Sequence, residues 1–374
     1  MEDVKQNDKT KKPIITNTQD ELLPGTLIFD GKYRILGKIG DGGMATVYKA
    51  VRNIDNEIVA IKLNKANFRT EREYESFVSN FRNEVNNIAS LNNLSKYVIK
   101  LYDWDVNKNS MWLIVLEYVG GGTLNDLLKG LSVFSLKEMQ YYFGQIIDAL
   151  IVAHKNGIIH RDIKPENIFL TEIGEVRLGD FGISFTSENS KEAKKKIGTP
   201  KFMPPELISN ASASKQSDIY SLGVVMYIAA TGTAPFVTSK TSEKGREDLF
   251  IKHVSQSPIR PSSVNPDIPN KLSNLILKMI EKSPNDRPAS MEYVYRELMS
   301  PDVNLTAKLY HYKGRRKFFL DQTEPKQKWK SQRAIGYSES RPYYLRFRFI
   351  ILWFGIFFLT FSFLILALVF AVIK

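Results

Sequence analysis

The stretch GIIHRDIKPENIFL, residues 157–170, places a group of charged and polar side chains between two apolar runs. Apolar flanks of this length are typical of two short strands packed against a core, so the polar octet between them is predicted to be a loop held in a fixed position. Loops held by a rigid scaffold often carry binding and catalytic residues. The chemistry of this loop depends on the groups that the rest of the chain brings beside it.

A second carboxylate, Asp180 in GDFGIS, follows this loop along the chain. Two short predicted strands joined by a turn, residues 168–170 and 176–178, would bring Asp180 back beside Asn167. The oxygen atoms of these two side chains are hard ligands suited to Mg²⁺ with bound phosphates. Taken alone, GDFGIS could also be a structural Asp-x-Gly turn.

A glycine-rich stretch, KIGDGGMATVYKA at residues 38–50, has Gly40, Gly42 and Ala45 in the G-x-G-x-x-G/A pattern. A dinucleotide-binding turn has the same pattern, but such a turn must open a helix. Strand formers follow here at residues 46–48, so the loop is predicted to join two strands. A flexible glycine loop between strands can offer backbone N–H groups to a triphosphate.

Lys62 ends the apolar strand IVAIK, and Glu84 lies in a stretch whose apolar residues recur at helical spacing. An isolated lysine in this position would be a surface side chain with its stem along the sheet. A carboxylate on the helix would instead fix the ammonium group of Lys62 where it can bind phosphates.

These groups together predict phosphoryl transfer. Asp162 would orient an incoming hydroxyl and accept its proton, and Lys164 would neutralise the transferring phosphoryl group. Asn167 and Asp180 would hold the metal ions. Arg161 looks buried and has no partner nearby in the sequence, which favours a phosphate from elsewhere as its partner.

The elements that position these residues fall into two regions. From residue 33 to about 116 the pattern is strand-like with one helical stretch, and from residue 124 to about 300 helical patterns dominate. One helix is predicted to begin after an N-cap at Ser135, with a glutamate three residues on, and to stop at Gly157. The fold class is therefore α+β, with a small β-rich lobe followed by a larger helical lobe.

Composition and charge indicate which kinds of partner the chain could bind. The 374 residues are 43% hydrophobic and 25% charged, and they include no cysteine, which excludes disulfides, thiolate metal sites and a thiol nucleophile. Much of the net charge of +12 lies in residues 302–348, where twelve Lys and Arg stand against four Asp and Glu. An uncharged stretch follows directly, so we expect this segment to face anionic lipid rather than nucleic acid.

Residues 349–373 carry no charge, and 25 residues at about 1.5 Å each exceed the roughly 30 Å hydrocarbon core of a bilayer. We expect a single transmembrane helix, a C-terminal tail anchor in the cell membrane, rather than a buried core helix or a removable lipid-anchor signal. Three arginines in residues 341–348 precede it and only Lys374 follows, which predicts that residues 33–300 are cytoplasmic. Residues 1–32 are predicted to be a disordered arm.

The motifs HRDIKPEN, DFG, VAIK and the glycine loop occur in the order and spacing of eukaryotic-like (Hanks-type) protein kinases, and the chain resembles that family over residues 33–300. GDGGMATVYKA looks most like the bacterial, membrane-anchored serine/threonine members. The resemblance implies a bilobal protein-kinase fold with a hinge at residues 117–122, and ATP with Mg²⁺ (or Mn²⁺) under the glycine loop. The ATP-binding residues that it implies are Ile39, Gly40, Asp41, Gly42, Gly43, Val47, Ala60, Lys62, Glu117, Val119 and Phe169.

Other residues match structural positions of the family. The acid matching Glu206 pairs with the arginine matching Arg287, and the acid matching Asp218 braces the catalytic loop. Residues 180–206 look like an activation segment that would self-activate by autophosphorylation, its phosphate pairing with Arg161. A constitutively ordered loop is the alternative. The candidate phosphosites are Ser184, Thr186, Ser187 and Ser190.

Two positions depart from the family pattern: Ala45 replaces the third glycine of the loop, and Pro204 replaces the usual alanine of the A-P-E triplet. Neither change removes a group used in phosphoryl transfer, which disfavours an inactive pseudokinase scaffold. In this family Lys164, two residues after Asp162, predicts serine or threonine as the acceptor. We expect Thr199 to serve as a structural hydroxyl near Asp162.

We therefore expect an ATP-dependent serine/threonine protein kinase that is tethered to the membrane for signal transduction. Its expected partners are protein substrates, membrane lipids at the basic juxtamembrane segment 301–348, and a second copy of the chain in a homodimer formed within the membrane. No nucleic acid is expected. A membrane adaptor that recruits partners through the basic segment is the alternative from another class, and ATP turnover separates the two. The sequence does not name the substrates or the activating signal.

Overall fold

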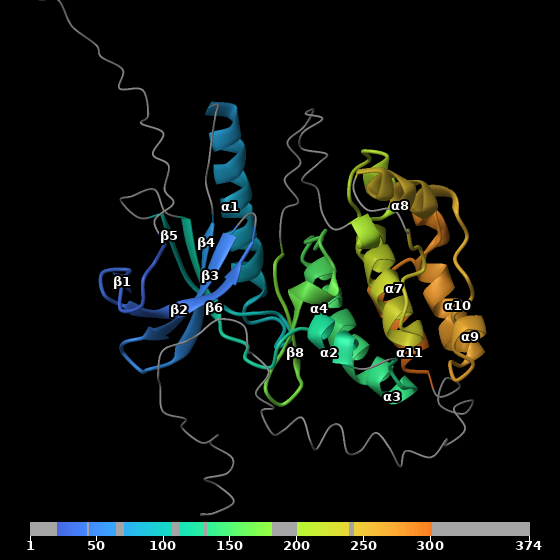
Figure 1. Cartoon of the computed structure of the whole chain (residues 1–374), viewed down its shortest axis with the longest axis horizontal. Coiled ribbons are helices and arrows are strands. Elements are labelled where there is room, and N and C mark those ends of the chain that lie inside the picture. Colours follow the sequence, from blue (N-terminus) through green and yellow to red (C-terminus); the bar gives the residue numbers. More distant parts are fainter. Residues whose placement is uncertain are drawn as a thin grey trace, which may run out of the picture. The chain divides into compact units, whose positions relative to one another are not determined.

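The computed structural model describes residues 21–42, 45–64, 71–106, 112–130, 133–181, 200–238 and 243–300. A sheet with one long helix precedes a group of helices along the chain (Figure 1). The predicted α+β architecture, a β-rich lobe followed by a helical lobe, is confirmed.

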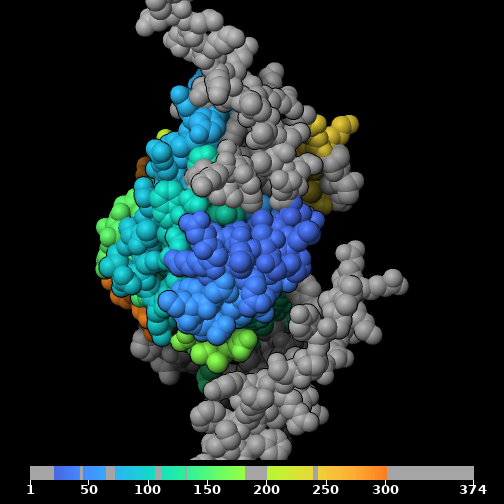
Figure 2. Space-filling view, turned by 90° about the vertical axis from the view of Figure 1, so that its left-hand side faces the viewer, coloured from blue at the N-terminus to red at the C-terminus, as the bar shows by residue number. Residues whose placement is uncertain are grey.

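The β-rich lobe is a six-stranded sheet in the order β1-β2-β3-β4-β6-β5, with every neighbouring pair antiparallel. Figure 2 shows the side of this lobe on which β1 and β2 lie, in blue. Side chains alternate between the two faces because successive residues of a strand point in opposite directions. The strands are β1 (Leu27–Ile28), β2 (Tyr33–Asp41), β3 (Ala45–Arg52), β4 (Ile58–Asn64), β5 (Leu101–Val106) and β6 (Trp112–Glu117).

The long helix of this lobe, α1 (Glu71–Leu91), contains Glu84, as the helical spacing of its apolar residues predicts. Its apolar face packs on the sheet, where the rings of Phe81 and Trp112 lie 5.0 Å apart between centroids. The rotation of α1 about its axis, and with it the direction of Glu84, follows from this burial. The apolar residues that recur at helical spacing around Glu84 are all buried: Phe77, Phe81, Val85, Ile88 and Leu91.

The chain before β2 is part of the lobe, so the prediction of a disordered arm over residues 1–32 was wrong for residues 21–32. Leu22 and Ile28 are buried in a cluster with Tyr48, and the backbone N–H of Leu22 donates to the Tyr48 hydroxyl at 3.1 Å. A few apolar residues without periodicity do not predict a packed element. Leu22 and Ile28 nevertheless pack against the sheet in the cluster that contains Tyr48.

The helical lobe surrounds α7 (Lys215–Thr231), in which every residue from Ser217 to the end is buried. A helix that is apolar on all sides is typical of the centre of a helical domain. The other helices are α2 (Leu124–Gly130), α3 (Leu136–Glu138), α4 (Gly144–Lys155), α6 (Pro205–Ile208), α8 (Glu243–Ser255), α9 (Pro261–Val264), α10 (Asn270–Met279) and α11 (Met291–Leu298).

The helix predicted between Ser135 and Gly157 is interrupted. Its ends agree with the prediction, since Ser135 forms a capping box with Glu138 and Gly157 has a positive φ of 75°. Between α3 and α4, however, residues Met139–Phe143 form a π-helical turn. The side chain of Gln145 donates to the carbonyl of Tyr141 there and accepts the backbone N–H of Val176, which links the turn to the strand β8.

The hairpin of β7 (Ile168–Leu170) and β8 (Val176–Leu178) lies between the sheet and the helices. Leu178 exchanges backbone hydrogen bonds with Tyr97 and Ile99 at 2.7 and 2.9 Å, just before β5. Leu170 does the same with Gly121 and Gly122, just after β6, at 2.9 Å each. The hairpin therefore fixes the chain on both sides of the hinge region.

The segment predicted to cross the membrane is not part of the described structure. None of the helices in the part that the structure describes is both long and apolar enough to cross a bilayer. The predicted transmembrane helix 349–373 and the basic segment 301–348 lie outside the described residues.

Gly121 lies so close to β7 that we expect Gly121→Ala to destabilise the fold by about 1–3 kcal/mol. An added Cβ would lie 2.3 Å from the carbonyl oxygen of Thr171 and 2.5 Å from that of Leu170, and backbone atoms cannot move aside cheaply. Thermal unfolding of the purified chain measures the change. Gly37→Ala is the control, because a Cβ there meets no atom within 4 Å, and equal unfolding midpoints for both variants would contradict the prediction.

Candidate active site

The polar loop predicted from the sequence connects α4 to β7 and brings the predicted catalytic residues Asp162 and Lys164 together with the predicted metal ligand Asn167. The ammonium group of Lys164 lies 2.6 Å from Oδ2 of Asp162. The side-chain amide of Asn167 donates to the same Oδ2 at 2.9 Å and to the Asp162 carbonyl at 2.8 Å. Both donors bind one oxygen of the carboxylate, so its orientation is fixed on that side.

Asp218, buried in α7, holds this loop through its backbone. Its Oδ1 accepts the N–H of Arg161 at 2.9 Å, and its Oδ2 accepts the N–H of His160 at 2.8 Å. His154 of α4 lies 2.8 Å from the same Oδ2 through its Nε2. No pattern in the sequence pointed to His154, because its partner is 64 residues away.

Arg161 differs from its prediction in one respect. Its side chain is exposed, not buried, and its backbone has a positive φ of 70°, a conformation that is uncommon for residues other than glycine. The backbone bond to Asp218 helps to hold it there. Within the described part of the chain its guanidinium group has no recorded ion pair, so it is available to an anion.

His160 connects the loop to the segment that contains Asp180. It is fully buried, its Nε2 lies 3.0 Å from the carbonyl oxygen of Gly179, and its ring lies 4.6 Å from that of Phe181. Burial lowers the pKa of His160, although Asp218 and Asp162 oppose this effect. The histidine is therefore a neutral packing residue rather than an acid or base.

Lys62 of β4 lies between two carboxylates from different elements. Its ammonium group is 2.7 Å from Glu84 of α1 and 2.9 Å from Asp180. Burial alone would lower the pKa of Lys62, but the two carboxylates outweigh it and raise the pKa above the usual value. Lys62 in turn lowers the pKa of Asp180. The lysine is thus a fixed cation, held where the glycine loop, the helix and the hairpin meet.

The two predicted metal ligands are neighbours. The N–H of Gly179 donates to the backbone carbonyl of Asn167 at 3.0 Å, which places Asp180 one residue from this contact. The side chains offer hard oxygen atoms, which fit Mg²⁺. The described residues contain no cluster of three or more His, Asp or Glu that could hold a metal ion by itself. A divalent cation at this site would need further oxygens, such as those of phosphates.

The glycine loop joins β2 to β3, as its sequence predicted, and not a strand to a helix. Gly40 is paired with Val47 across the two strands, and Asp41 with Thr46. Val47 is in turn paired with Lys62 of β4, so the loop, Val47 and the cation lie in one region of the sheet. Ile39 is exposed on β2. Gly42 closes the loop with an N–H that donates to the Ala45 carbonyl at 2.9 Å.

The residues predicted to bind adenine lie around the end of β6, where the chain leaves the sheet. Ala60, Val119 and Phe169 are all partly exposed and pack against the same core. Glu117 is the last residue of β6, the strand paired with β4. Gly179 lies under Phe169, and a Cβ there would be 2.8 Å from the ring.

The predicted pair in the helical lobe is present and bidentate. The two terminal nitrogens of Arg287 lie 2.8 Å from the two carboxylate oxygens of Glu206, and Ser217 donates to Glu206 at 2.7 Å. Burial would raise the pKa of Glu206, but these donors outweigh it and lower the pKa. The pair fixes the start of α6 against α7 and the segment before α11.

Several predicted residues cannot be placed, because they lie outside the described residues. They are Gly43 of the glycine loop, the candidate phosphosites Ser184, Thr186, Ser187 and Ser190, and Thr199.

Comparison with known proteins gives one consistent result. The family described as "Protein kinase domain" matches residues 33–299. A probable serine/threonine-protein kinase of Clostridium acetobutylicum is 35% identical over 279 residues, covering 74% of this chain and 41% of that protein. The serine/threonine-protein kinase PrkC of Bacillus subtilis is 33% identical over 264 residues, covering 70% of this chain and 39% of that protein. The aligned part is thus about two fifths of the length of these relatives.

We expect Asp218→Asn to lower the free energy of unfolding by about 2 kcal/mol or more. An amide replaces one acceptor oxygen with a donor, so at least one buried N–H loses its partner. Urea denaturation measures the loss. The exposed Asp267→Asn is the matched control, expected to change stability by less than about 0.5 kcal/mol. Equal effects of the two substitutions would show that Asp218 does not brace the loop.

Acidification should destabilise the chain between about pH 6.5 and 5. Burial lowers the pKa of His160, and it lowers the pKa of the buried His253 to about 4. Below the unfolded value of about 6.5 the unfolded chain takes up protons that the folded chain does not, so stability falls by up to about 1.4 kcal/mol per pH unit for His253, and His160 acts in the same direction. Urea denaturation at several pH values measures this slope. His253→Gln should reduce the slope, and a stability independent of pH in this range would contradict the assignment of both histidines as neutral.

Proposed function

The chain belongs to the Hanks-type protein kinase family and to its bacterial serine/threonine members, and we propose from this that it transfers the γ-phosphoryl group of ATP to serine or threonine hydroxyls of proteins. One observation carries the proposal: Asp162, Lys164 and Asn167 form a single hydrogen-bonded group beside a lysine that two carboxylates hold. A protein that used this fold only as a scaffold would not need these groups in place.

Asp162 is the group that receives the proton of the incoming hydroxyl. Lys164 and Asn167 both donate to its Oδ2, so Oδ1 is the oxygen that we expect to face the acceptor. The same Lys164 supplies positive charge beside the reacting oxygen. In this chemistry the acceleration comes from positioning and electrostatic stabilisation, and both depend on the loop that Asp218 holds.

Lys62 would bind the phosphates of the nucleotide, and Glu84 keeps its ammonium group in position when they bind. Asn167 and Asp180 would hold Mg²⁺ (or Mn²⁺), which would neutralise negative charge on the phosphates. The backbone of the glycine loop would cover the phosphates. Adenine would lie between Ala60 and Phe169, with the backbone of residues 117–119 as its hydrogen-bonding partner.

Control of activity by autophosphorylation of residues 180–206 is part of the proposal. The exposed guanidinium group of Arg161, on a loop fixed by Asp218, supports it, because a phosphate on the segment could pair with this group. A constitutively ordered segment is the competing explanation.

We also propose that residues 349–373 anchor the protein in the cell membrane, with the catalytic lobes in the cytoplasm. The uncharged length of this stretch and the arginines before it support this topology. The basic segment 301–348 would contact anionic lipid, and pairing within the membrane would favour phosphorylation of one copy by another in a signalling role.

Lys62→Met and Asp162→Asn should each lower the phosphorylation rate at least 100-fold, since each removes a group that acts in the transition state. The assay incubates the full chain with Mg-ATP and casein and identifies the phosphorylated residues, which should be serine and threonine. Lys96→Met is the control, because that exposed lysine pairs only with Glu175 among the recorded ion pairs. Near wild-type rates in either site variant, or mainly phosphotyrosine as product, would contradict the proposal.

A further inference from the structure

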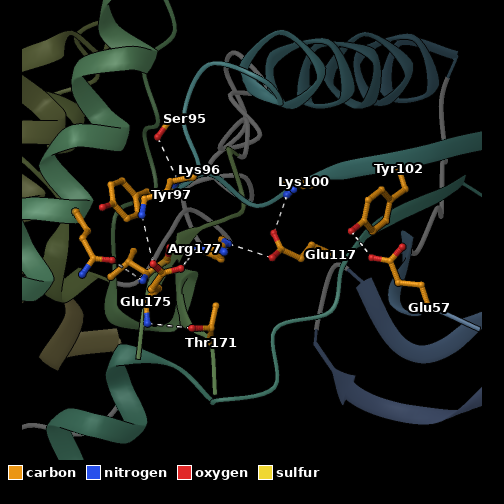
Figure 3. Close-up of polar contacts among 12 residues, drawn as sticks. Glu57, Ser95, Lys96, Tyr97, Lys100, Tyr102, Glu117, Thr171, Glu175 and Arg177 are labelled. Carbon is orange, nitrogen blue, oxygen red and sulfur yellow. Dashed lines mark hydrogen bonds and ion pairs between the residues drawn. The ribbon is translucent and has the colours of Figure 1, made fainter. Parts of the chain in front are cut away.

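One ion pair joins the end of the sheet to the hairpin of the helical lobe. Figure 3 shows Glu117, the last residue of β6, between Arg177 of β8 and Lys100. The Nε of Arg177 donates to Oε1 of Glu117 at 3.0 Å, and the backbone N–H of Lys100 donates to Oε2 at 3.4 Å. The backbone N–H of Glu117 itself donates to the Lys100 carbonyl at 2.8 Å. The carboxylate is thus held from both sides, once by each lobe.

The two charged side chains are largely buried, with 14% of Arg177 and 18% of Glu117 exposed. Removing Arg177 leaves the carboxylate of Glu117 without an opposite charge in a poorly solvated place, whereas Arg177 has a second, longer ion pair with Glu175 at 3.5 Å. Nη1 of Arg177 also donates to the Val176 carbonyl at 3.0 Å, which fixes the guanidinium group on its own strand. The pair is therefore a rigid link and not a surface contact between mobile side chains.

The position of Arg177 in the hairpin relates it to the nucleotide site. Arg177 and Phe169 are directly paired across β7 and β8, and residues so paired carry their side chains on the same face. Phe169 is the residue proposed to lie under adenine, and Glu117 begins the backbone proposed to bind its edge. The hairpin therefore carries the floor of the site and, through Arg177, holds the start of the hinge.

The backbone hydrogen bonds of the hairpin do not hold residues 117–119 directly. They reach the sheet at Tyr97 and Ile99, before β5, and the hinge region at Gly121 and Gly122. Residues 117–119 lie between these two attachment points. The ion pair with Arg177 ties residue 117 itself to the hairpin.

We propose that Arg177 is a positioning residue for the nucleotide. Through Glu117 it fixes the backbone of residues 117–119 relative to Phe169, so that the groups that meet the edge and the face of adenine keep one geometry. The inference rests on the proposed function, because it needs a nucleotide at this site. It concerns binding and not the chemical step, since Lys62 and Asp162 make no contact with the pair.

The test compares Arg177→Gln with the unchanged chain. Calorimetric titration with Mg-ADP should show roughly tenfold weaker binding, and the KM for ATP should rise by a similar factor while kcat stays within about twofold. Glu117→Gln should have the same effect, and the double variant should be no worse than either single one, because both remove the same link. Arg177→Lys, which keeps the charge, should recover part of the affinity.

Lys155→Gln is the matched control. It removes an exposed ion pair with Glu292, at 3.7 Å, that shares no residue with the pairs of Arg177, so nucleotide affinity should not change. Thermal unfolding of each variant separates folding from binding. If Arg177→Gln and Arg177→Lys bind Mg-ADP as tightly as the unchanged chain, the pair only stabilises the fold and the inference is overturned. If the unchanged chain itself binds no nucleotide, the proposed function fails instead.

Discussion

A carboxylate buried in the central helix of the helical lobe, that of Asp218, sets the geometry on which the candidate site depends. It accepts two consecutive backbone N–H groups of the catalytic loop and faces a histidine of the preceding helix. A loop that carries several charges and one residue with positive φ would have many conformations of similar energy in water. Two short hydrogen bonds to a buried anion select one of them, and the orientation of Asp162 follows.

From this loop, chains of contacts extend in two directions. Through Asn167 and Gly179 it reaches Asp180, and from there Lys62, so that residues from both lobes meet around one ammonium group. Through the β7–β8 hairpin it reaches both sides of the hinge. The helix α1 adds Glu84 because its aromatic residues fix it on the sheet. The site thus consists of a few polar links, each of which is held in place by apolar packing.

Much of this could be predicted from the sequence, because the chemistry is local. Residues 160–167 lie in one short segment, and the glycine loop, Lys62 and Asp180 each lie in or next to a recognisable strand. The links between elements could not be predicted in the same way. Arg177 and Glu117 are 60 residues apart, and nothing in VRL or in VLE marks them as partners. Residues 21–32 and the π-helical turn were missed for a related reason, since tertiary packing outweighs the local pattern in both.

Gly179 has a consequence for ligands of the proposed nucleotide site. It lies directly under the ring of Phe169, and its lack of a side chain is what allows the ring to lie so low. A residue with a Cβ at this position would push the ring of Phe169 toward the proposed position of adenine and leave less room for a bound ring system. Ligands with thick or twisted ring systems should therefore distinguish this protein from relatives that have a larger residue before the Asp-Phe-Gly turn, which gives the position value for selective inhibition.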